Sequence, residues 1–215
     1  MLLRPEPGLS ASAARARDLG LDVITCPLFR IEAVPWNVPD PAEFSGLLLS
    51  SANAIRFGGP GLAGLMSLPA HAVGEATAAA ARNAGFHVAT VGNGDFEQLL
   101  AALPGTSGLL HLAGEDHRDV GRESIERLIL YRSVAIADPG LPVSSGLVAA
   151  VHSPRAGSRF AELVDERSDT VIAAISDAAA AACGRGWNAI EVAERPSDKS
   201  LLALAARLCQ TPVQQ

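Results

Sequence analysis

Hydroxyl and amide side chains in this sequence stand where short apolar runs end. The leucines at residues 47–49 lead into Ser51 and Asn53, and the apolar run at residues 147–151 is followed by Ser153. Further candidates at comparable positions are Gly74, Thr77, Gly114, Arg155 and Ser176. Hydroxyls, arginines and backbone N–H groups can bind anions in a chain whose only lysine is Lys199. The pattern therefore indicates a polar rim suited to an anionic ligand.

Five of these residues also have a purely structural interpretation. Ser51, Asn53 and Ser153 are residue types that cap helix N-termini, which stabilises a helix by about 1 kcal/mol. Gly74 and Gly114 are typical of tight turns. Residue type alone is compatible with both the binding role and the structural role.

The only tyrosine of the chain, Tyr131, lies in the apolar stretch 128–134. On an extended strand, a tyrosine is more often a half-buried packing residue than an acid. Upstream, the charged residues 115–119 are typical of a solvated loop or helix start, although Arg118 at a strand end could bind an anion. Both residues therefore stay candidates with an ordinary alternative.

An internal repeat indicates which elements must position these residues. Four pairs of residues share one register, 102 or 101 residues apart: Ser51 with Ser153, Gly74 with Ser176, Leu99 with Leu201, and Gly85 with Gly186. In each copy, short apolar runs alternate with longer alanine-rich amphipathic runs, which is the pattern of βα units in a parallel sheet. The sequence therefore predicts two copies of one small α/β domain.

The expected strands of the two copies are residues 46–50, a strand leading to residue 73, residues 86–91, residues 146–151, a strand leading to residue 175, and residues 187–192. In each copy, a first helix is expected to begin near Asn53 or Arg155. A second helix should run through the alanines to a C′ glycine, Gly85 or Gly186, and a third should cover residues 99–103 or 201–208. Ligands of open parallel sheets bind at the carboxyl ends of strands. The polar candidates all fall at such ends.

Two further units complete the expected organisation. The N-terminal segment predicts a strand at residues 1–4, a helix at residues 10–19 and a strand at residues 21–26. A strand at residues 108–112 and a helix within residues 114–127 form a matching unit in the middle of the chain. Because this unit is short, its helix must be clipped or its next strand must begin early, near Ile125.

Composition and charge exclude several classes of protein. A net charge of −6 without a Lys/Arg cluster argues against nucleic-acid binding. Cys26, Cys183 and Cys209 are odd in number and lack CxxC spacing, and no histidine pair has metal-binding spacing, so neither disulfides nor a metal site are expected. Without a signal peptide or a bilayer-length apolar run, we expect a soluble, cytoplasmic protein with no membrane partner.

A formal GxGxxG motif occurs at residues 59–64. In dinucleotide-binding proteins, these glycines directly follow a strand and open a helix. Here they follow an expected helix, and a proline separates the first two glycines. We therefore expect an ordinary loop rather than a nucleotide site.

The sequence resembles the uroporphyrinogen-III synthase family over nearly its whole length. The resemblance is carried by LLRP at residues 2–5, Pro27, SSANA at residues 50–54, VGEATA at residues 73–78, AGF at residues 84–86, GED at residues 114–116, YR at residues 131–132 and SP at residues 153–154. Each motif is weak alone, but their order and spacing make the match specific.

The resemblance implies an α/β fold of two similar flavodoxin-like parallel-sheet domains joined by a two-stranded linker. Residues 1–34 and 137–215 would form one discontinuous domain, and residues 35–136 an inserted domain. Residues 29–35 and 128–135 would supply the linker strands. The internal repeat agrees with this arrangement independently.

The resemblance also implies a reaction. The family closes linear hydroxymethylbilane to uroporphyrinogen III with loss of water and inversion of the last pyrrole ring, without cofactor or metal. A tyrosine in the family assists departure of the hydroxyl, and Tyr131 occupies that place. The implied substrate-binding residues are Arg4, Ser51, Asn53, Gly74, Thr77, Gly114, Arg118, Ser153, Arg155 and Ser176. A monomer is expected.

The sequence departs from the family at several of these positions. Residues 176–180 read SDAAA where the family usually has GPTTA, so a hydroxyl equivalent to that of Thr77 is missing. Ala113 replaces a common arginine, and Arg155 replaces a common serine. A bilobal binding or regulatory protein descended from the enzyme is therefore the alternative interpretation.

Overall fold

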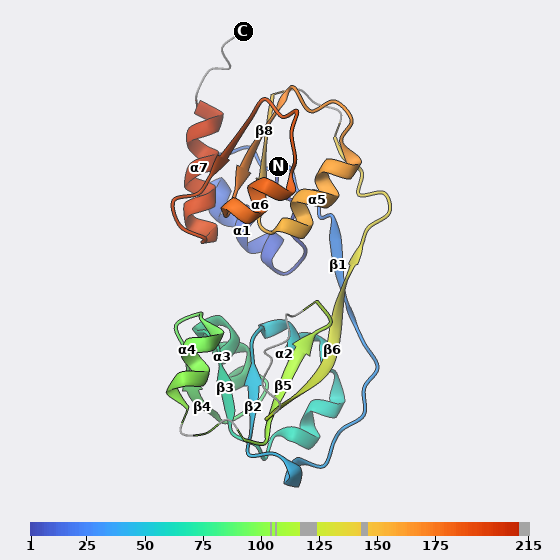
Figure 1. Ribbon diagram of the computed structural model, residues 1–215, viewed down its shortest axis with the longest axis vertical. Helices are drawn as coiled ribbons and strands as arrows, with labels where there is room; N and C mark the ends of the chain where they lie inside the picture. The colour runs from blue at the N-terminus through green and yellow to red at the C-terminus, as the bar shows by residue number, and fades with distance from the viewer. Residues whose placement is uncertain (104, 106, 117–123, 143–145, 211–215) are drawn as a thin grey trace. The chain divides into compact units, whose positions relative to one another are not determined.

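The structure is a computed structural model that describes residues 1–103, 105, 107–116, 124–142 and 146–210. It contains two compact units (Figure 1). Unit 1 consists of Met1–Arg30 and Ala135–Gln215, and unit 2 consists of Ile31–Val134. Each unit has its own parallel sheet with helices on both faces, as the α/β prediction required.

Unit 2 is organised by a sheet with the strand order β1-β6-β5-β2-β3-β4. Its strands are β1 (Phe29–Ala33), β2 (Gly46–Leu49), β3 (Ala70–Ala72), β4 (Val88–Val91), β5 (Leu109–Gly114) and β6 (Ile125–Ala135). Its helices are α2 (Ala52–Phe57), α3 (Glu75–Asn83) and α4 (Phe96–Ala102), with short 3₁₀ segments η1 (Pro41–Glu43) and η2 (Pro60–Leu65). Neighbouring strands from β6 to β4 are parallel.

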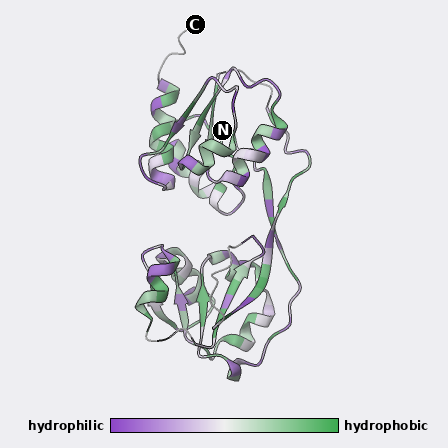
Figure 2. Cartoon of the chain, viewed as in Figure 1, coloured by the Kyte–Doolittle hydropathy of each residue, from purple (hydrophilic) through white to green (hydrophobic). Residues whose placement is uncertain are grey.

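Side-chain alternation along β2 explains why helices cover both faces of this sheet. All of β2 is buried, and the strand is coloured hydrophobic in Figure 2. Leu47 and Leu49 point into a cluster with residues of α2, η2 and α3, whereas Leu48 joins Leu99 and Leu100 of α4. Successive residues of a strand face opposite sides, so one leucine run supplies both cores.

Unit 1 repeats this plan with three strands in the order β7-β8-β9. The strands are β7 (Leu147–Val151), β8 (Thr170–Ala174) and β9 (Ala189–Val192), and the helices are α1 (Gly8–Asp18), α5 (Pro154–Leu163), α6 (Asp177–Ala182) and α7 (Asp198–Gln210). Ala149 and Val151 pack with α5 and α6, whereas Val148 and Ala150 pack with α1 and α7. The unit therefore also has two cores, one on each face of its sheet.

Several expected elements are confirmed with small changes of boundary. Helices begin directly after Ser51 and Ser153. Gly85, with a φ of +94°, follows α3 as a C′ glycine. A strand begins at Ile125, as the short spacing predicted, while the helix expected within residues 114–127 falls mostly on residues outside the described part of the chain. Strands are present at both positions expected for the linker, β1 and β6, which are neighbours in the sheet.

Four expectations are wrong in detail. The strands at residues 1–4 and 21–26 are reduced to isolated bridges, because Leu2 pairs only with Thr25 and Ala150. Helix α6 ends before Gly184, whose φ is +70°, so Gly184 rather than Gly186 follows the helix. The strand expected at residues 108–112 runs instead from Leu109 to Gly114. The GxGxxG segment lies in the connection between α2 and β3, which agrees with the expected loop, and it includes the short 3₁₀ segment η2.

Candidate functional site

Polar residues predicted from the sequence meet at the carboxyl edge of the sheet in unit 2. Strands β2, β3 and β5 are parallel, and Leu49 of β2 lies level with the last residue of β3 and with Leu112 of β5. Ser51 follows β2, Gly74 follows β3 and Gly114 ends β5. The structure therefore brings these three residues to one edge, where ligands of parallel sheets bind.

Tyr131 lies at the same edge. Strand β6 pairs it with Gly114. The centroid of the Phe57 ring is 6.4 Å from that of Tyr131. Burial raises the pKa of Tyr131, the polar side chain of Ser51 opposes this shift, and the charge of Asp116 adds to it. The phenol is therefore protonated at neutral pH and can donate a proton.

Ser51 also caps a helix. Its hydroxyl accepts the backbone N–H of Asn53 at 3.2 Å, at the start of α2. The expectation that Asn53 is a cap is wrong, because its N–H is the group that is capped. Its side-chain Oδ1 instead accepts a hydrogen bond from Arg56 at 3.4 Å.

The glycine candidates are not turn glycines. Gly74 is the N-cap of α3 with a φ of −158°, which is extended backbone open to any residue. Gly114 lies in β5 and has no positive φ. Thr77, in the first turn of α3, is only 8% exposed, so its hydroxyl is largely enclosed by the protein. Arg118 lies outside the described residues.

A buried histidine that the sequence analysis did not single out links two strands next to this edge. His111, in the middle of β5, is fully buried, and its Nε2 atom lies 2.8 Å from the hydroxyl oxygen of Ser50. The Phe96 ring centroid is 5.0 Å from the His111 ring. The pair ties the end of β2 to β5, directly before Ser51. The available signal was a lone histidine within an apolar strand, which needs a polar partner on the neighbouring strand.

Unit 1 carries an equivalent carboxyl edge. Val151 of β7 lies level with the end of β8, and Ser153 and Ser176 follow these strands. The hydroxyl of Ser153 accepts the N–H of Ala156 at 3.2 Å and caps α5, while Ser176 caps α6 in the same way. The capping interpretation of Ser153 is therefore confirmed, and Ser176, for which the sequence analysis expected no cap, has the same role. Capping leaves the second lone pair and the hydrogen of each hydroxyl for other partners.

Arg155, the second residue of α5, places its guanidinium 4.6 Å from the centroid of the Phe29 ring. Its side chain is exposed. A guanidinium over an aromatic face is attracted to the ring electrons, which favours this placement of the side chain.

Arg4 belongs to a polar cluster centred on Asp198, the first residue of α7. Its Nη1 atom donates to Ser12 Oγ at 3.1 Å and to Asp198 Oδ1 at 3.2 Å. Arg15 forms an ion pair with the same carboxylate, and His152 Nε2 lies 2.8 Å from Oδ1. Sequence reasoning missed Ser12, Arg15, His152 and Asp198, because they are far apart in the chain and belong to no motif.

Burial and charge shift two pKa values in this cluster. Burial lowers the pKa of His152, with Arg4 acting in the same direction, although the hydrogen bond to Asp198 opposes the shift. Burial alone would raise the pKa of Asp198, but hydrogen bonds from Ser12, His152 and Arg15 outweigh it and hold the pKa below its usual value. The cluster at neutral pH thus combines a carboxylate with a neutral imidazole and two guanidinium groups.

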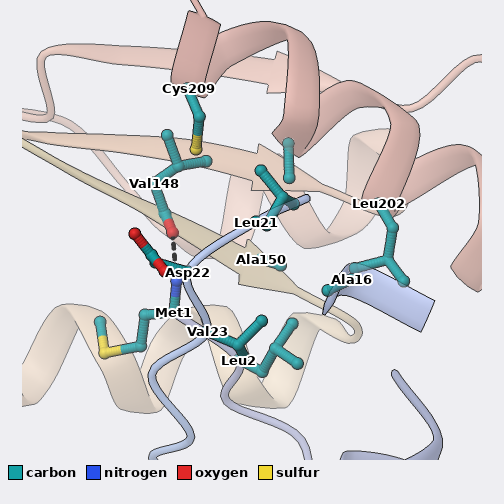
Figure 3. Close-up of a pocket in the computed structure, with 11 residues that line it drawn as sticks. Met1, Leu2, Ala16, Leu21, Asp22, Val23, Val148, Ala150, Leu202 and Cys209 are labelled. Carbon is teal, nitrogen blue, oxygen red and sulfur yellow. Dashed lines mark hydrogen bonds between the residues drawn. The ribbon is translucent and has the colours of Figure 1, made fainter. Parts of the chain in front are cut away.

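Two cavities in the described part of unit 1 lie away from the carboxyl edge of its sheet. Figure 3 shows a cavity of about 30 Å³ lined mainly by apolar side chains, among them Leu2, Ala16 and Leu202, where the Met1 amine donates to the Val148 carbonyl at 2.6 Å. A cavity of this size has no room for a substrate. A larger cavity of about 750 Å³ includes the first residues of β7 and β8 in its lining, and so lies at the amino edge of the sheet.

Three further findings concern chemistry and membrane contact. All three cysteines are free, as expected. Within the described part of the chain, no group of three or more His, Cys, Asp or Glu side chains is arranged to hold a metal ion. None of the helices among the described residues has the length and hydropathy needed to cross a membrane.

Comparison with known proteins assigns the family. The family model of uroporphyrinogen-III synthase HemD matches residues 10–203. The chain belongs to this family, as the sequence motifs indicated.

Solved structures show the same fold. The uroporphyrinogen-III synthetase from Helicobacter pylori is 19% identical, with a TM-score of 0.67 over 87% of this chain and 95% of that one. A mutant uroporphyrinogen III synthase from Thermus thermophilus is 18% identical, with a TM-score of 0.53 over 98% of this chain and 99% of that one. Comparison with curated protein sequences gives no significant match.

Proposed function

We propose that this chain is a cyclising lyase, a uroporphyrinogen-III synthase that acts in tetrapyrrole biosynthesis. It would convert hydroxymethylbilane into uroporphyrinogen III with loss of water and inversion of the terminal pyrrole ring. The observation that carries the proposal is membership of the family over residues 10–203, with the single tyrosine at the polar edge of unit 2. In parallel-sheet folds, ligands bind at the carboxyl ends of the strands, and the function has to be argued from the residues found there.

Tyr131 is the proposed general acid. Because burial raises the pKa of its phenol, the group holds its proton at neutral pH. Departure of hydroxide from the bilane needs one proton, and the cation left behind is stabilised by the pyrrole. A single positioned acid therefore suffices for the elimination. No redox step or metal-activated water is required, so we propose a reaction without cofactor.

Substrate carboxylates are proposed to bind at the carboxyl edges of both sheets. The proposed contacts are Arg4, Ser51, Asn53, Gly74, Thr77, Gly114, Arg118, Ser153, Arg155 and Ser176. Arg155 is the strongest cationic candidate, because its side chain is exposed. Arg4 already pairs with Asp198, so only the N–H groups outside that pair are available to a ligand. We further propose that the protein acts as a monomer in the cytoplasm.

The direct test is an activity assay with hydroxymethylbilane, followed by oxidation and separation of the uroporphyrin isomers. The proposal expects the III isomer in the presence of the protein. Production of the I isomer alone, at the rate of a protein-free control, would refute it.

Substitution Tyr131→Phe tests the assigned acid. We expect turnover to fall by about a hundredfold or more, because the only nearby phenolic proton is removed while the ring and its packing remain. Far-UV circular dichroism should match that of the parent protein. Unchanged turnover would return Tyr131 to a packing role.

A further inference from the structure

A polar cluster at the carboxyl edge of the sheet in unit 1 surrounds the side chain of Arg4. Leu2 forms a parallel bridge with Ala150, so Arg4 and His152, each two residues further along, leave the sheet at the same edge. Helix α7 follows β9 and also begins at this edge, with Asp198 as its first residue. His152 Nε2 lies 2.8 Å from Asp198 Oδ1. Arg4 therefore lies where the substrate contacts of unit 1 are proposed.

Two neighbours hold one end of the Arg4 guanidinium. Nη1 donates to Ser12 Oγ at 3.1 Å and to Asp198 Oδ1 at 3.2 Å, which uses both of its hydrogens. The Ser12 hydroxyl is fully buried and donates in turn to Asp198 Oδ1 at 2.5 Å. The Asp198 side chain is only 17% exposed. A carboxylate held in this way binds the guanidinium at a single location.

Gly8, the first residue of α1, leaves the space that the rest of the guanidinium occupies. A Cβ added to Gly8 would lie 2.5 Å from both Nε and Nη2 of Arg4, so the guanidinium rests against the backbone at the start of the helix. Nε and Nη2 carry three further hydrogens, and the Arg4 side chain is 31% exposed. The cluster therefore fixes this group without burying it completely, as binding of an anion requires.

The charges of the cluster favour an anionic ligand. Arg15 pairs with the other oxygen of the Asp198 carboxylate, so two guanidinium groups face one carboxylate. A positive charge remains at this edge whether or not His152 is protonated, although the net charge of the chain is −6. Apolar side chains in place of a buried ion pair often cost no stability, so stability is a weak reason for charged residues at this place.

We propose that Asp198 and Ser12 are positioning residues that hold the Arg4 guanidinium at the carboxyl edge of unit 1 for one carboxylate of the substrate. This inference rests on the proposed function, in which Arg4 is a substrate contact. A guanidinium that is already held loses less side-chain entropy on binding, so it binds a carboxylate more tightly than a mobile one. Its loss should raise KM rather than lower kcat, because the contact is to a part of the substrate that does not react.

Side-chain dynamics test the positioning without any substrate. The heteronuclear ¹⁵N–¹H NOE of Arg4 Nε reports motion on the ps–ns timescale, and Arg4→Lys identifies its signal by removing it. This NOE should indicate a rigid side chain in the parent protein and a flexible one in Asp198→Ala. Glu162→Ala, which removes another carboxylate paired with an arginine of unit 1, should leave the NOE unchanged. The same NOE in the parent protein and in Asp198→Ala would overturn the inference.

A double-mutant cycle tests the link to substrate binding. Asp198→Ala and Arg4→Ala should each raise KM for hydroxymethylbilane about tenfold at nearly constant kcat, the effect of losing one hydrogen bond between charged groups. The double variant should have the KM of Arg4→Ala, because Asp198 acts through Arg4. Loss of a negative charge would by itself favour an anionic substrate, so a general charge effect has the opposite sign. Additive effects of the two substitutions would overturn the inference.

Gly8→Ala displaces the guanidinium while all of its partners stay in place. The three atoms nearest to the added methyl group belong to the flexible end of Arg4, and alanine favours a helix over glycine, so the fold should be retained. KM should rise about threefold or more, because the guanidinium moves away from Asp198. Circular dichroism verifies that each variant is folded.

An unchanged KM in both Gly8→Ala and Asp198→Ala would overturn the inference. Absence of III-isomer formation by the parent protein would instead overturn the proposed function. The NOE measurement does not depend on that result, because it needs no substrate.

Discussion

At the scale of single residues, the position of the Tyr131 phenol in unit 2 depends on the volume that Gly114 leaves free for the ring. Gly114 has no positive φ, so its backbone does not require glycine. The Tyr131 ring does require glycine at this position, because the ring occupies the volume that a side chain would need. A small residue in β5 and a large one in β6 therefore act together to set the direction of the phenol.

Substitution Gly114→Ala is expected to show this dependence. The added methyl group would overlap the ring, so the unfolding free energy of unit 2 should fall by about 1–3 kcal/mol. Turnover should fall as well, because the phenol is displaced from its position at the carboxyl edge of the sheet. Chemical denaturation followed by fluorescence of Trp36, the tryptophan of unit 2, measures the first effect.

Gly105→Ala is the matched control for this substitution. A Cβ there would have nothing within 4 Å, so stability and turnover should stay unchanged. A Gly114→Ala protein as stable and as active as the parent would show that the ring can relax without loss.

At the scale of elements, helix starts and strand ends are joined by polar contacts from distant parts of the chain. In unit 1, the Asp198 carboxylate at the start of α7 binds Ser12 and Arg15 of α1, and His152 at the exit of β7. These contacts join elements on one face of the sheet to the edge that carries Ser153. Because His152 and Asp198 have shifted pKa values, we expect the stability of unit 1 to depend on pH.

The expected pH effect is a loss of unit 1 stability in mild acid. Burial holds the pKa of His152 below its usual value of about 6.5, so the unfolded state binds more protons than the folded state as pH falls through this value. Stability should therefore decrease from about pH 7 to pH 5. At lower pH, protonation of Asp198 removes its ion pairs and adds to the loss, because the folded-state pKa of this group is also lowered.

His152→Gln should flatten this pH dependence, because glutamine keeps a donor for Asp198 but does not titrate. Urea denaturation of both proteins in a Trp36→Phe background isolates unit 1, where buried Trp187 stacks on Phe160 with ring centroids 5.1 Å apart. His71→Gln is the control, because burial also lowers the pKa of His71, but this histidine lies in unit 2. An equally steep pH dependence after His152→Gln would contradict the assignment.

At the scale of the whole molecule, the two units differ in how the chain builds them. Unit 2 is one continuous segment with its own two hydrophobic clusters. Unit 1 is discontinuous, and Leu2, Leu3 and Leu9 from its first segment pack against residues of its second. The sequence placed an inserted domain at residues 35–136, and this boundary stays a prediction beside the compact unit Ile31–Val134.

This difference predicts how fragments fold. Residues 31–134 expressed alone should unfold cooperatively, because both of their cores are complete. Residues 135–215 alone should not, because they lack Leu3 and the α1 residues that fill their cores. Circular dichroism and tryptophan fluorescence during urea denaturation measure both outcomes. Cooperative unfolding of residues 135–215 alone would contradict the second expectation.

The sequence by itself determined the α/β class, the repeat, the family and the polar strand ends, because these depend on local apolar periodicity and on the order of short motifs. Ser51 and Ser153 could be recognised as possible caps for the same reason, whereas the cap at Ser176 was not expected. Packing of the folded chain was needed to bring Tyr131 to the same sheet edge as Ser51, to leave room for the phenol at Gly114, and to pair Arg4 with Asp198. Those contacts join residues up to 194 positions apart, and side-chain pairing over such separations depends on how helices and strands pack, which no local pattern encodes.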